Sequence, residues 1–386
     1  MHPEDLKKMP DDIARIFMNM ENRVMADIIA RIKENAMSPA TSDWQIRRLI
    51  VLGESSDYIK KQIQKALEAS DEEIERILSD EVYKEYTTYD RPYQITGVPR
   101  RTFEENEELQ QLVKATTEQI SQEYHNLANS AGFAIKGENG KTVYSPVMNF
   151  YRETLDAAVI DVKSGMYSYQ QVLNRTVKAM SMSGLRWIDY ASGHHNRIDV
   201  AARRAILTGF RQIQGKINEQ IAAELGTNHY EVDWHTGARP DHMTWQGKVY
   251  SREELESVCG LGDITGLCGA NCYHNYEPFI KGVSQRRYSD EWLEAQNKKE
   301  LEPKEYNGKG YTTYEALQKQ RRMETQMRAD RQNIKLLKDG GATKEQLDQA
   351  KAKYRGHRQQ YNDFAEKMNL PNDMKRVYQD GLGRVS

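Results

Sequence analysis

Residues 230–274 read YEVDWHTGARPDHMTWQGKVYSREELESVCGLGDITGLCGANCYH, and this stretch departs from the helical pattern around it. Its first five residues alternate aromatic or apolar side chains with acidic ones, which predicts a strand. A loop rich in Gly, Cys and His follows, and residues 276–280 are expected to return to the same sheet. We therefore expect a compact α+β domain that begins where the pattern changes, after Gly184.

The part of the chain before this domain follows helical periodicity. Apolar residues recur every three or four positions over 11–88, which predicts a layer of four helices. We expect breaks in this layer at Gly53 and at Ser70, where Glu73 completes a capping-box pattern. Further helices are expected over about 103–182, interrupted by a Gly-containing stretch.

The part after the α+β domain is helical and polar. Residues 311–338 and 343–368 read as two antiparallel helices joined at Gly340 and Gly341. Their apolar stripe is thin, which favours a partner-binding coiled coil or a peripheral arm.

The sequence thus predicts a mainly α protein in four parts. These are an N-terminal helical domain (1–90), a helical middle region (91–184), an α+β domain with the Cys/His-rich loop (185–285), and a C-terminal helical hairpin or coiled-coil arm (286–386).

Composition agrees with extended helical layers. Hydrophobic residues make up 38 % and charged residues 29 % of the 386 residues. No apolar run is long enough for a membrane span, and the first residues do not resemble a signal peptide, so we expect a protein made in the cytoplasm. The net charge is −2, but residues 304–386 hold 18 Lys and Arg against 11 Asp and Glu. Interleaved acidic residues favour a solvated helix surface there over a DNA-binding one.

Four soft ligands for zinc lie close together in the loop: Cys259, Cys268, Cys272 and His274. Nearby glycines let a backbone fold tightly around an ion. The spacing C-x8-C-x3-C-x-H lacks the two-residue knuckle of strong zinc motifs, however. The alternative is a tight loop in which the cysteines are small buried apolar residues and the histidine binds backbone.

A second group comprises His235, Asp241 and His242, which a turn through Gly237 and Pro240 could bring together as a metal or acid/base set. Structural roles are favoured, because an acidic residue at a strand end commonly accepts from backbone N–H groups. Arg239 is also placed to pair with Asp241. Thiol catalysis would need a cysteine beside a histidine base, which the sequence alone does not show.

Several strings of this chain closely resemble the phage minor capsid protein 2 family. They are GARPDHMTWQGKVYS (237–251), GLCGANCYHNYEPF (266–279), DVAARRAILTGF (199–210), SDWQIRRLIVLGE (42–54) and EYNGKGYTTYEALQKQRRMET (305–325). Residues 185–285 are also similar to the broader Mu F-like head morphogenesis domain. The residues that carry the motif are His235, Gly237, Arg239, Pro240, His242, Trp245, Gly247, Lys248, Gly269 and Asn271.

The resemblance implies a minor structural protein of a tailed-phage or prophage head, made in a bacterial host and carried in the virion. It implies a place at or near the portal vertex and a role in head assembly or in DNA packaging and ejection. The expected partners are the portal protein and the major capsid protein, with DNA as a further candidate through the C-terminal arm. No enzymatic activity, small-molecule substrate or membrane contact is expected. The alternative is a zinc-dependent hydrolase or nuclease domain, which would use the cluster at 235–274.

Overall fold

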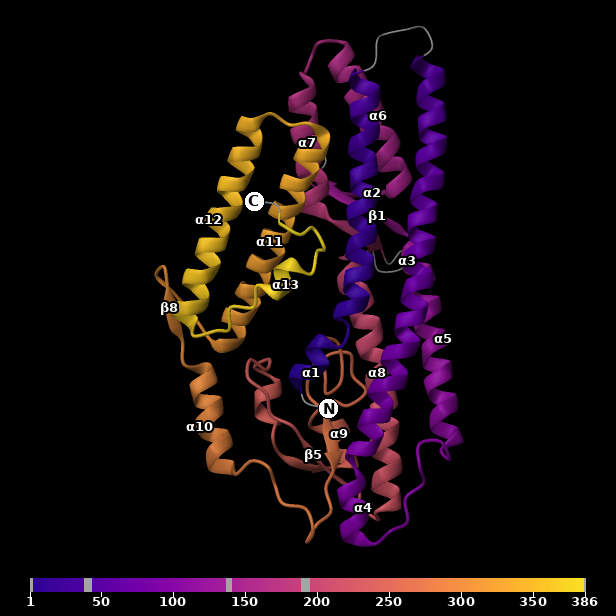
Figure 1. Ribbon diagram of the computed structural model, residues 1–386. Coiled ribbons are helices and arrows are strands. Elements are labelled where there is room, and N and C mark those ends of the chain that lie inside the picture. The colour runs from indigo at the N-terminus through magenta and orange to yellow at the C-terminus, as the bar shows by residue number, and fades with distance from the viewer. Residues whose placement is uncertain (1–2, 38–43, 137–140, 189–194, 385–386) are drawn as a thin grey trace.

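A computed structural model describes residues 3–37, 44–136, 141–188 and 195–384. Of these residues 66 % are helical, which confirms a mainly α protein with a small α+β part (Figure 1). The helices are α1 (Pro3–Lys8), α2 (Asp11–Met37), α3 (Trp44–Thr88), α4 (Asp90–Thr96), α5 (Glu107–Asn129), α6 (Val147–Lys163), α7 (Tyr169–Ser183), α8 (Ile198–Glu224), α9 (Arg252–Ser257), α10 (Asp290–Leu301), α11 (Thr313–Gly340), α12 (Lys344–Met368) and α13 (Lys375–Tyr378), with a 3-10 turn η1 (His242–Thr244). The strands are β1 (Ala131–Lys136), β2 (Thr142–Pro146), β3 (Leu185–Ile188), β4 (His195–Arg197), β5 (His229–Val232), β6 (Val249–Ser251), β7 (Tyr276–Pro278), β8 (Lys304–Tyr306) and β9 (Lys309–Tyr311).

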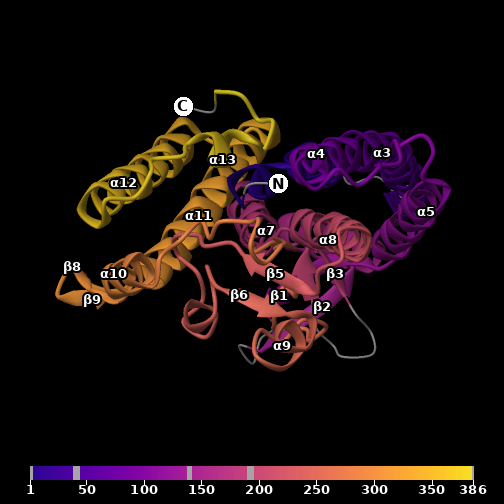
Figure 2. The same cartoon turned by 90° about the horizontal axis from the view of Figure 1, so that it is seen from below.

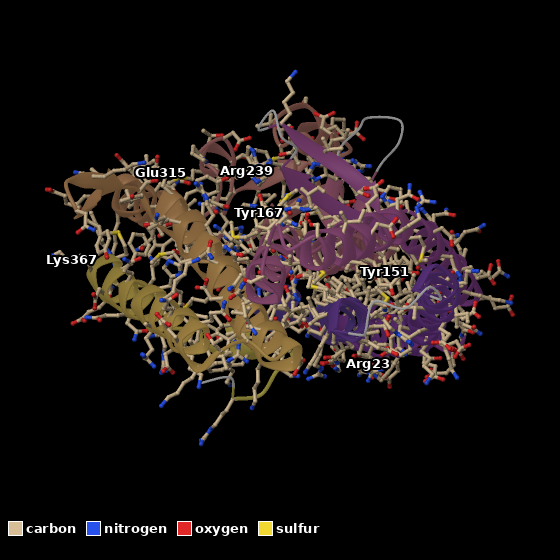
Figure 3. All side chains as sticks on the ribbon, turned by 90° about the horizontal axis from the view of Figure 1, so that it is seen from above. Arg23, Tyr151, Tyr167, Arg239, Glu315 and Lys367 are labelled. Carbon is tan, nitrogen blue, oxygen red and sulfur yellow. The ribbon has the colours of Figure 1, made fainter. Side chains whose placement is uncertain are left out.

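The large core lies around α2, which contacts α3, α6, α8 and α11. Apolar residues occupy every third or fourth position of α2, and their side chains are almost wholly buried. The sequence predicts this pattern for a helix that begins near Asp11. Phe17 packs edge-on against Tyr124 of α5 at 5.3 Å between ring centroids. The Tyr124 hydroxyl donates to Ala202 O of α8, so a buried polar group is satisfied within the core. Figure 3 shows Tyr151 inside this helical body and Lys367 on α12 of the arm.

The N-terminal layer has fewer helices than the sequence predicts. Residues 44–88 form one continuous helix, α3, so the breaks expected at Gly53 and Ser70 are wrong. Ser70 donates its hydroxyl to Leu67 O within the helix instead of capping a new one. Gly53 lies where a Cβ would meet open space, so nothing there requires a turn. The sequence also predicts that a helix of this layer starts near Thr41–Asp43, and these residues lie outside the described ones.

A four-stranded antiparallel sheet, in the order β2-β1-β3-β4, closes one side of the helical body. The strand expected from Leu185 is present as β3, and it pairs with β1. The stretch expected as a simple break, 132–141, instead contributes to the β1–β2 hairpin, whose register places Phe133 opposite Ser145. The sequence also predicts a turn at Ser192 and Gly193, and these residues lie outside the described ones.

The second sheet, in the order β6-β5-β7, has a small core of its own. The strands expected near 230 and 276 are thereby confirmed as β5 and β7, and Ser251 caps α9 in a capping box with Glu254. In contrast, β3, β4 and α8 pack within or beside the large core. Figure 2 shows β5 and β6 beside α8, on the side away from α3 and α5. The four-domain division of the chain remains a prediction.

The two antiparallel helices of the C-terminal part are confirmed as α11 and α12, with Gly341 ending α11 in the left-handed conformation. We define the arm as α10 to α13. The arm is not held by its thin apolar stripe alone, because α11 lies between α12 and the helices α2 and α7. Its second buried face is polar: Arg331 binds Asp380 through two hydrogen bonds, and Arg376 donates to Glu324.

The crossing of α5 and α8 gives a test of this packing. A Cβ at Gly209 would lie 2.5 Å from Ile120 Cδ1 and 2.8 Å from Thr116 Cγ2. We expect Gly209→Val to lower the free energy of unfolding by about 1–3 kcal/mol, because a close-packed core has no room for the added atoms. Gly356→Val on α12, where a Cβ meets open space, is the matched control and should change stability little. Equal melting temperatures for the two variants would contradict the packing of α8 on α5.

Candidate metal centre

The Cys/His-rich segment forms a compact unit around the second sheet. The chain leaves β5, turns at Gly237 with a positive φ of 70°, and enters η1. It returns through β6, α9 and a glycine-rich loop before β7 pairs with β5. Trp245, Leu255 and Cys259 are buried in the small core of this unit. The loop therefore folds back over the strand ends, where His235 and η1 lie.

Three side chains from this segment converge: His242, Cys272 and His274. All are buried, and one potential ligand atom from each lies within 4.8 Å of the others. His274 Nδ1 is 3.4 Å from His242 Nδ1 and 3.4 Å from the Cys272 sulfur. His242 comes from the turn after β5, whereas the other two immediately precede β7. The cluster therefore connects two parts of the chain separated by 32 residues.

The other ring nitrogens of both histidines face oxygen atoms. His274 Nε2 lies 2.9 Å from the Gln246 side-chain oxygen, and His242 Nε2 lies 3.0 Å from Thr265 O. A ring nitrogen that faces a carbonyl-type oxygen carries the proton and donates it. With Nε2 protonated, the Nδ1 atom of each ring is the unprotonated one; His242 Nε2 also contacts Arg239, which can only donate. The arrangement directs two lone pairs and one thiol toward a common centre.

His235 stacks on this group from the strand side. Its ring centroid is 4.1 Å from that of His274, and its Nδ1 lies 3.0 Å from Thr236 O. Its Nε2 is buried and has no hydrogen-bond partner within the described ranges. Burial lowers the pKa of His235 to about 4, and burial also lowers the pKa of His242 and His274. All three imidazoles are therefore neutral near pH 7, which is the form that binds metals.

The two remaining cysteines of the predicted ligand set lie outside the three-residue group. Cys259 is almost wholly buried in the small core beside Leu267. Cys268 adopts a positive φ of 61°, and Arg211 Nη1 lies 3.6 Å from its sulfur. Burial raises the pKa of both thiols to about 12. Of the four predicted ligands, the structure thus brings Cys272 and His274 together and adds His242.

The second predicted set separates in the structure. Asp241 is exposed and lies 3.5 Å from Arg239 Nε, which agrees with the pairing expected between them. Arg239 also reaches across to Thr265 O and contacts His242 Nε2. His235 and His242 both border His274, so the turn does bring these rings to one place. The aspartate does not join them in the metal-ligand group.

The glycines of the family motif lie at close contacts. A Cβ at Gly237 would lie 2.1 Å from Leu317 Cδ1 of α11, and one at Gly247 would lie 2.4 Å from Leu293 Cδ2 of α10. A Cβ at Gly269 would lie 2.5 Å from Ile264 O, within the loop itself. Two of these glycines therefore allow the Cys/His unit to approach the arm, and one allows the loop to fold on itself.

Other motif residues have structural contacts. Trp245 packs against the rings of His242 and His274, at 4.4 and 4.8 Å between centroids. Lys248 donates to Thr244 O, and Asn271 takes a positive φ of 58°. Pro240 lies in the turn between Gly237 and η1.

Sequence reasoning missed two residues that orient the cluster, Gln246 and Thr265. Gln246 is completely buried, accepts from His274 and has an amide nitrogen 3.2 Å from Asn297 of α10. A glutamine next to a buried tryptophan is the only local signal for it. Thr265 acts through its backbone carbonyl, which no residue type could have revealed.

Comparison with known proteins identifies the class. A family model described as phage minor capsid protein 2 matches residues 1–366, nearly the whole chain, and the chain belongs to this family. It is therefore a minor capsid protein of a bacteriophage, with a structural role in the phage head and its morphogenesis. No curated protein and no solved structure matches significantly. None of the helices in the described ranges is both long and apolar enough to cross a membrane.

Proposed function

We propose that this protein acts at or near the portal vertex of the head, in head assembly or in DNA packaging and ejection, and that it contacts the portal protein and the major capsid protein. The observation that carries the proposal is the extent of the family match, which runs from α1 through almost all of α12. Body, Cys/His unit and arm therefore belong to one capsid-protein architecture. A protein of this kind works through its surfaces, which the neighbours in the head would bind.

The packing of the arm supports a single body that presents fixed surfaces. Arg328 of α11 lies 3.6 Å from Asp199 of α8, and Gln332 donates to Asn22 of α2. Tyr169 of α7 donates to Gly340 O at the end of α11. These contacts orient the arm relative to the body, so both can engage neighbours at a defined spacing.

Among the expected partners, DNA is less well supported than the portal protein and the major capsid protein. Several cations of residues 304–386 already pair with acidic groups of the same chain: Arg328, Arg331, Lys335, Lys353 and Arg376. Paired cations release fewer counterions on binding phosphate, so they contribute less to DNA affinity. The hydrolase alternative is also disfavoured, because a catalytic zinc needs a coordination position that substrate can reach, and His242, Cys272 and His274 are all buried.

The test is the location of the protein in particles of the phage or prophage that encodes it. Particles labelled with an antibody against a tag on the exposed side of α12 should carry label at one vertex, the one with the portal. Quantitative mass spectrometry should find far fewer copies than of the major capsid protein. Label distributed over the whole head, or absent from it, would contradict the proposal.

Deletion of the gene separates the two proposed roles. If the protein acts in assembly or packaging, the lysate should contain aberrant or empty heads. If it acts in ejection, DNA-filled particles should form but fail to infect. An unchanged titre of infectious particles would exclude both roles.

A further inference from the structure

We propose that His242, Cys272 and His274 bind a structural zinc ion through their two Nδ1 atoms and the Cys272 thiolate. The ion would connect the turn after β5 to the residue pair that enters β7. This inference is independent of the place of the protein in the head. It differs from the ligand set expected from sequence, since it leaves out Cys259 and Cys268 and includes His242.

The spacing of the three atoms fits zinc better than it fits hydrogen bonding. With Zn–N bonds of about 2.0–2.1 Å and a Zn–S bond of about 2.3 Å, a tetrahedral site separates two nitrogens by about 3.3 Å and a nitrogen from the sulfur by about 3.5 Å. The separation between the two Nδ1 atoms is 3.4 Å, as is that between His274 Nδ1 and the Cys272 sulfur, and the sulfur lies within 4.8 Å of its potential ligand atom on His242. As a direct hydrogen bond between the two rings, 3.4 Å would be long, since N–H···O hydrogen bonds are typically about 2.7–3.2 Å.

The outer contacts of the rings also match those of zinc ligands. Histidines that bind metal usually donate the other ring N–H to a carboxylate, carbonyl or water, which fixes the ring orientation. Gln246 accepts from His274 Nε2 and Thr265 O accepts from His242 Nε2. Both Nδ1 lone pairs are thereby directed at the same point. Without a cation there, two unprotonated nitrogens would face each other in a buried site, which is costly.

The contact of Arg239 with His242 Nε2 defines the competing arrangement. If Arg239 donated to Nε2, His242 would carry its proton on Nδ1 and could donate it to His274 without any metal. Thr265 O, 3.0 Å from the same Nε2, would then face a lone pair. Arg239 has Thr265 O as its own acceptor, so both it and the His242 N–H can donate to that one oxygen. The zinc site requires the arrangement with a protonated Nε2, so metal uptake by the wild-type chain distinguishes the two arrangements.

The neighbouring His235 gives an independent sign that the site is incomplete without a ligand. Its Nε2 is buried and has no partner in the part of the chain that the structure describes. Its ring lies against that of His274. Buried polar atoms without partners are rare and commonly mark an ion or water that binds them. His235 thus lies against one of the three ligands, with a buried Nε2 that has no partner among the described residues.

A zinc ion here would act as a structural element. The loop between His242 and Cys272 has little regular structure besides β6 and the short helix α9, so few backbone ladders hold it. Closing it with an ion would further stabilise the glycine-rich turns, which a small apolar core and backbone hydrogen bonds such as that from Leu267 N–H to Cys259 O also hold. Burial of the ligands agrees with a closed site.

The experiment measures metal in the full-length chain. Purified protein from zinc-supplemented cells should contain about one zinc per chain by elemental analysis. Cobalt added to the chelated protein should give the thiolate-to-cobalt charge-transfer band and the strong visible bands of a tetrahedral site. Chelation should lower the melting temperature, and zinc should restore it. A wild-type chain that takes up neither metal would overturn the proposal and leave the hydrogen-bonded histidine pair.

Two cysteine variants give the matched comparison. Cys272→Ser should reduce zinc content at least tenfold and abolish the charge-transfer band. Cys259→Ser also removes a buried thiol from the same small core but should keep full zinc content. Zinc retained in full by Cys272→Ser would exclude the assigned ligands. Because the cobalt spectrum is measured on the wild-type chain, the test stands even if a variant fails to fold.

Discussion

Replacing Arg197 by Met is expected to lower the free energy of unfolding by about 3–5 kcal/mol, since it strands a buried carboxylate. Arg197 Nη2 donates to both oxygens of Glu21, at 3.1 and 3.3 Å, and its Nε lies 3.5 Å from Asp199. Glu21 is 1 % exposed. Burial raises the pKa of Glu21 even with Arg197 in place. The arginine therefore does not fully offset the cost of burying the carboxylate. Methionine keeps much of the packing of the arginine stem and removes the charge.

The measurement is thermal and urea unfolding followed by circular dichroism. Arg286→Met is the matched control, because Arg286 is exposed and pairs with Asp290, four residues further along the chain. Exposed pairs of this kind contribute about 0–1 kcal/mol. The double variant Glu21→Gln/Arg197→Met should be more stable than Arg197→Met alone, since it no longer buries the unpaired charge. Equal losses for Arg197→Met and Arg286→Met would show that the centre of the body is not held in this way.

The buried ion pair of Arg197 and Glu21 also explains a second role of Gly184, which the sequence alone does not reveal. Gly184 is expected from the sequence to stop a helix, and it does end α7 with a φ of 64°. A Cβ at this position would lie 2.4 Å from the guanidinium carbon of Arg197. The glycine therefore also makes room for a buried cation from another element. The local sequence pattern predicts that Gly184 ends a helix. That it also makes room for Arg197 could not be predicted, because it depends on residues 13 positions apart meeting in the fold.

Elements with strong local periodicity were predictable for a simple reason. α2, α8, α11 and α12 each have a repeating apolar face or clear caps, and β5 has strict alternation. The prediction divided α3 wrongly because a glycine or a serine is only a weak signal for a helix end. Such a residue ends a helix where the tertiary contacts favour a change in chain direction. Here α3 packs along α2, α5 and α8, and these contacts favour its continuation. Tertiary packing outweighed the local signals.

The arm shows why a thin apolar stripe was misleading. Five of the twelve residues that α11 buries are polar or charged, including Gln320, Glu324, Asp330 and Arg331. Periodicity of apolar residues does not register a buried face made of ion pairs. The partners of these groups come from α12, α13 and the following residues, so they could not be assigned before the fold was known.

The candidate site was located by residue type but not by geometry. Soft ligands concentrated in 259–274 pointed to the loop in which Cys272 and His274 converge, whereas the sequence grouped His242 with His235 and Asp241. Which ligands converge depends on how β5 and β7 pair, since that pairing brings residues 242 and 274 together. Spacing along the chain carries no information about it.

The native chain is expected to resist alkylation at Cys259 by at least about a thousandfold. Burial raises the pKa of this thiol from 9.0 to about 12, and the thiolate is the reactive form, so each pKa unit removes about a factor of ten from the reactive population at pH 7. The side chain is also 1 % exposed, which denies access to the reagent. Iodoacetamide labelling followed by peptide mass spectrometry measures the rate at each cysteine separately.

An exposed cysteine introduced two residues earlier, by Ser257→Cys, is the internal reference. It should react at the rate of a free thiol in the same molecule, and Cys259 should match that rate only in denaturant. Modification of native Cys259 within tenfold of the reference rate would contradict the buried small core.

The same reasoning bears on thiol catalysis. A catalytic cysteine needs a lowered pKa and access to substrate, as an imidazolium neighbour or a helix N-terminus provides. Cys272 does lie 3.4 Å from His274, as such a pair would require. Burial raises the pKa of the thiol and lowers that of the imidazole, however, so both groups are neutral in the metal-free chain. A neutral, buried thiol and imidazole make a poor nucleophilic pair. They can still bind a metal, because the imidazole is already in its ligand form and only the thiol has to lose a proton. Slow alkylation at Cys272 that becomes faster on chelation would therefore favour a metal ligand over a nucleophile.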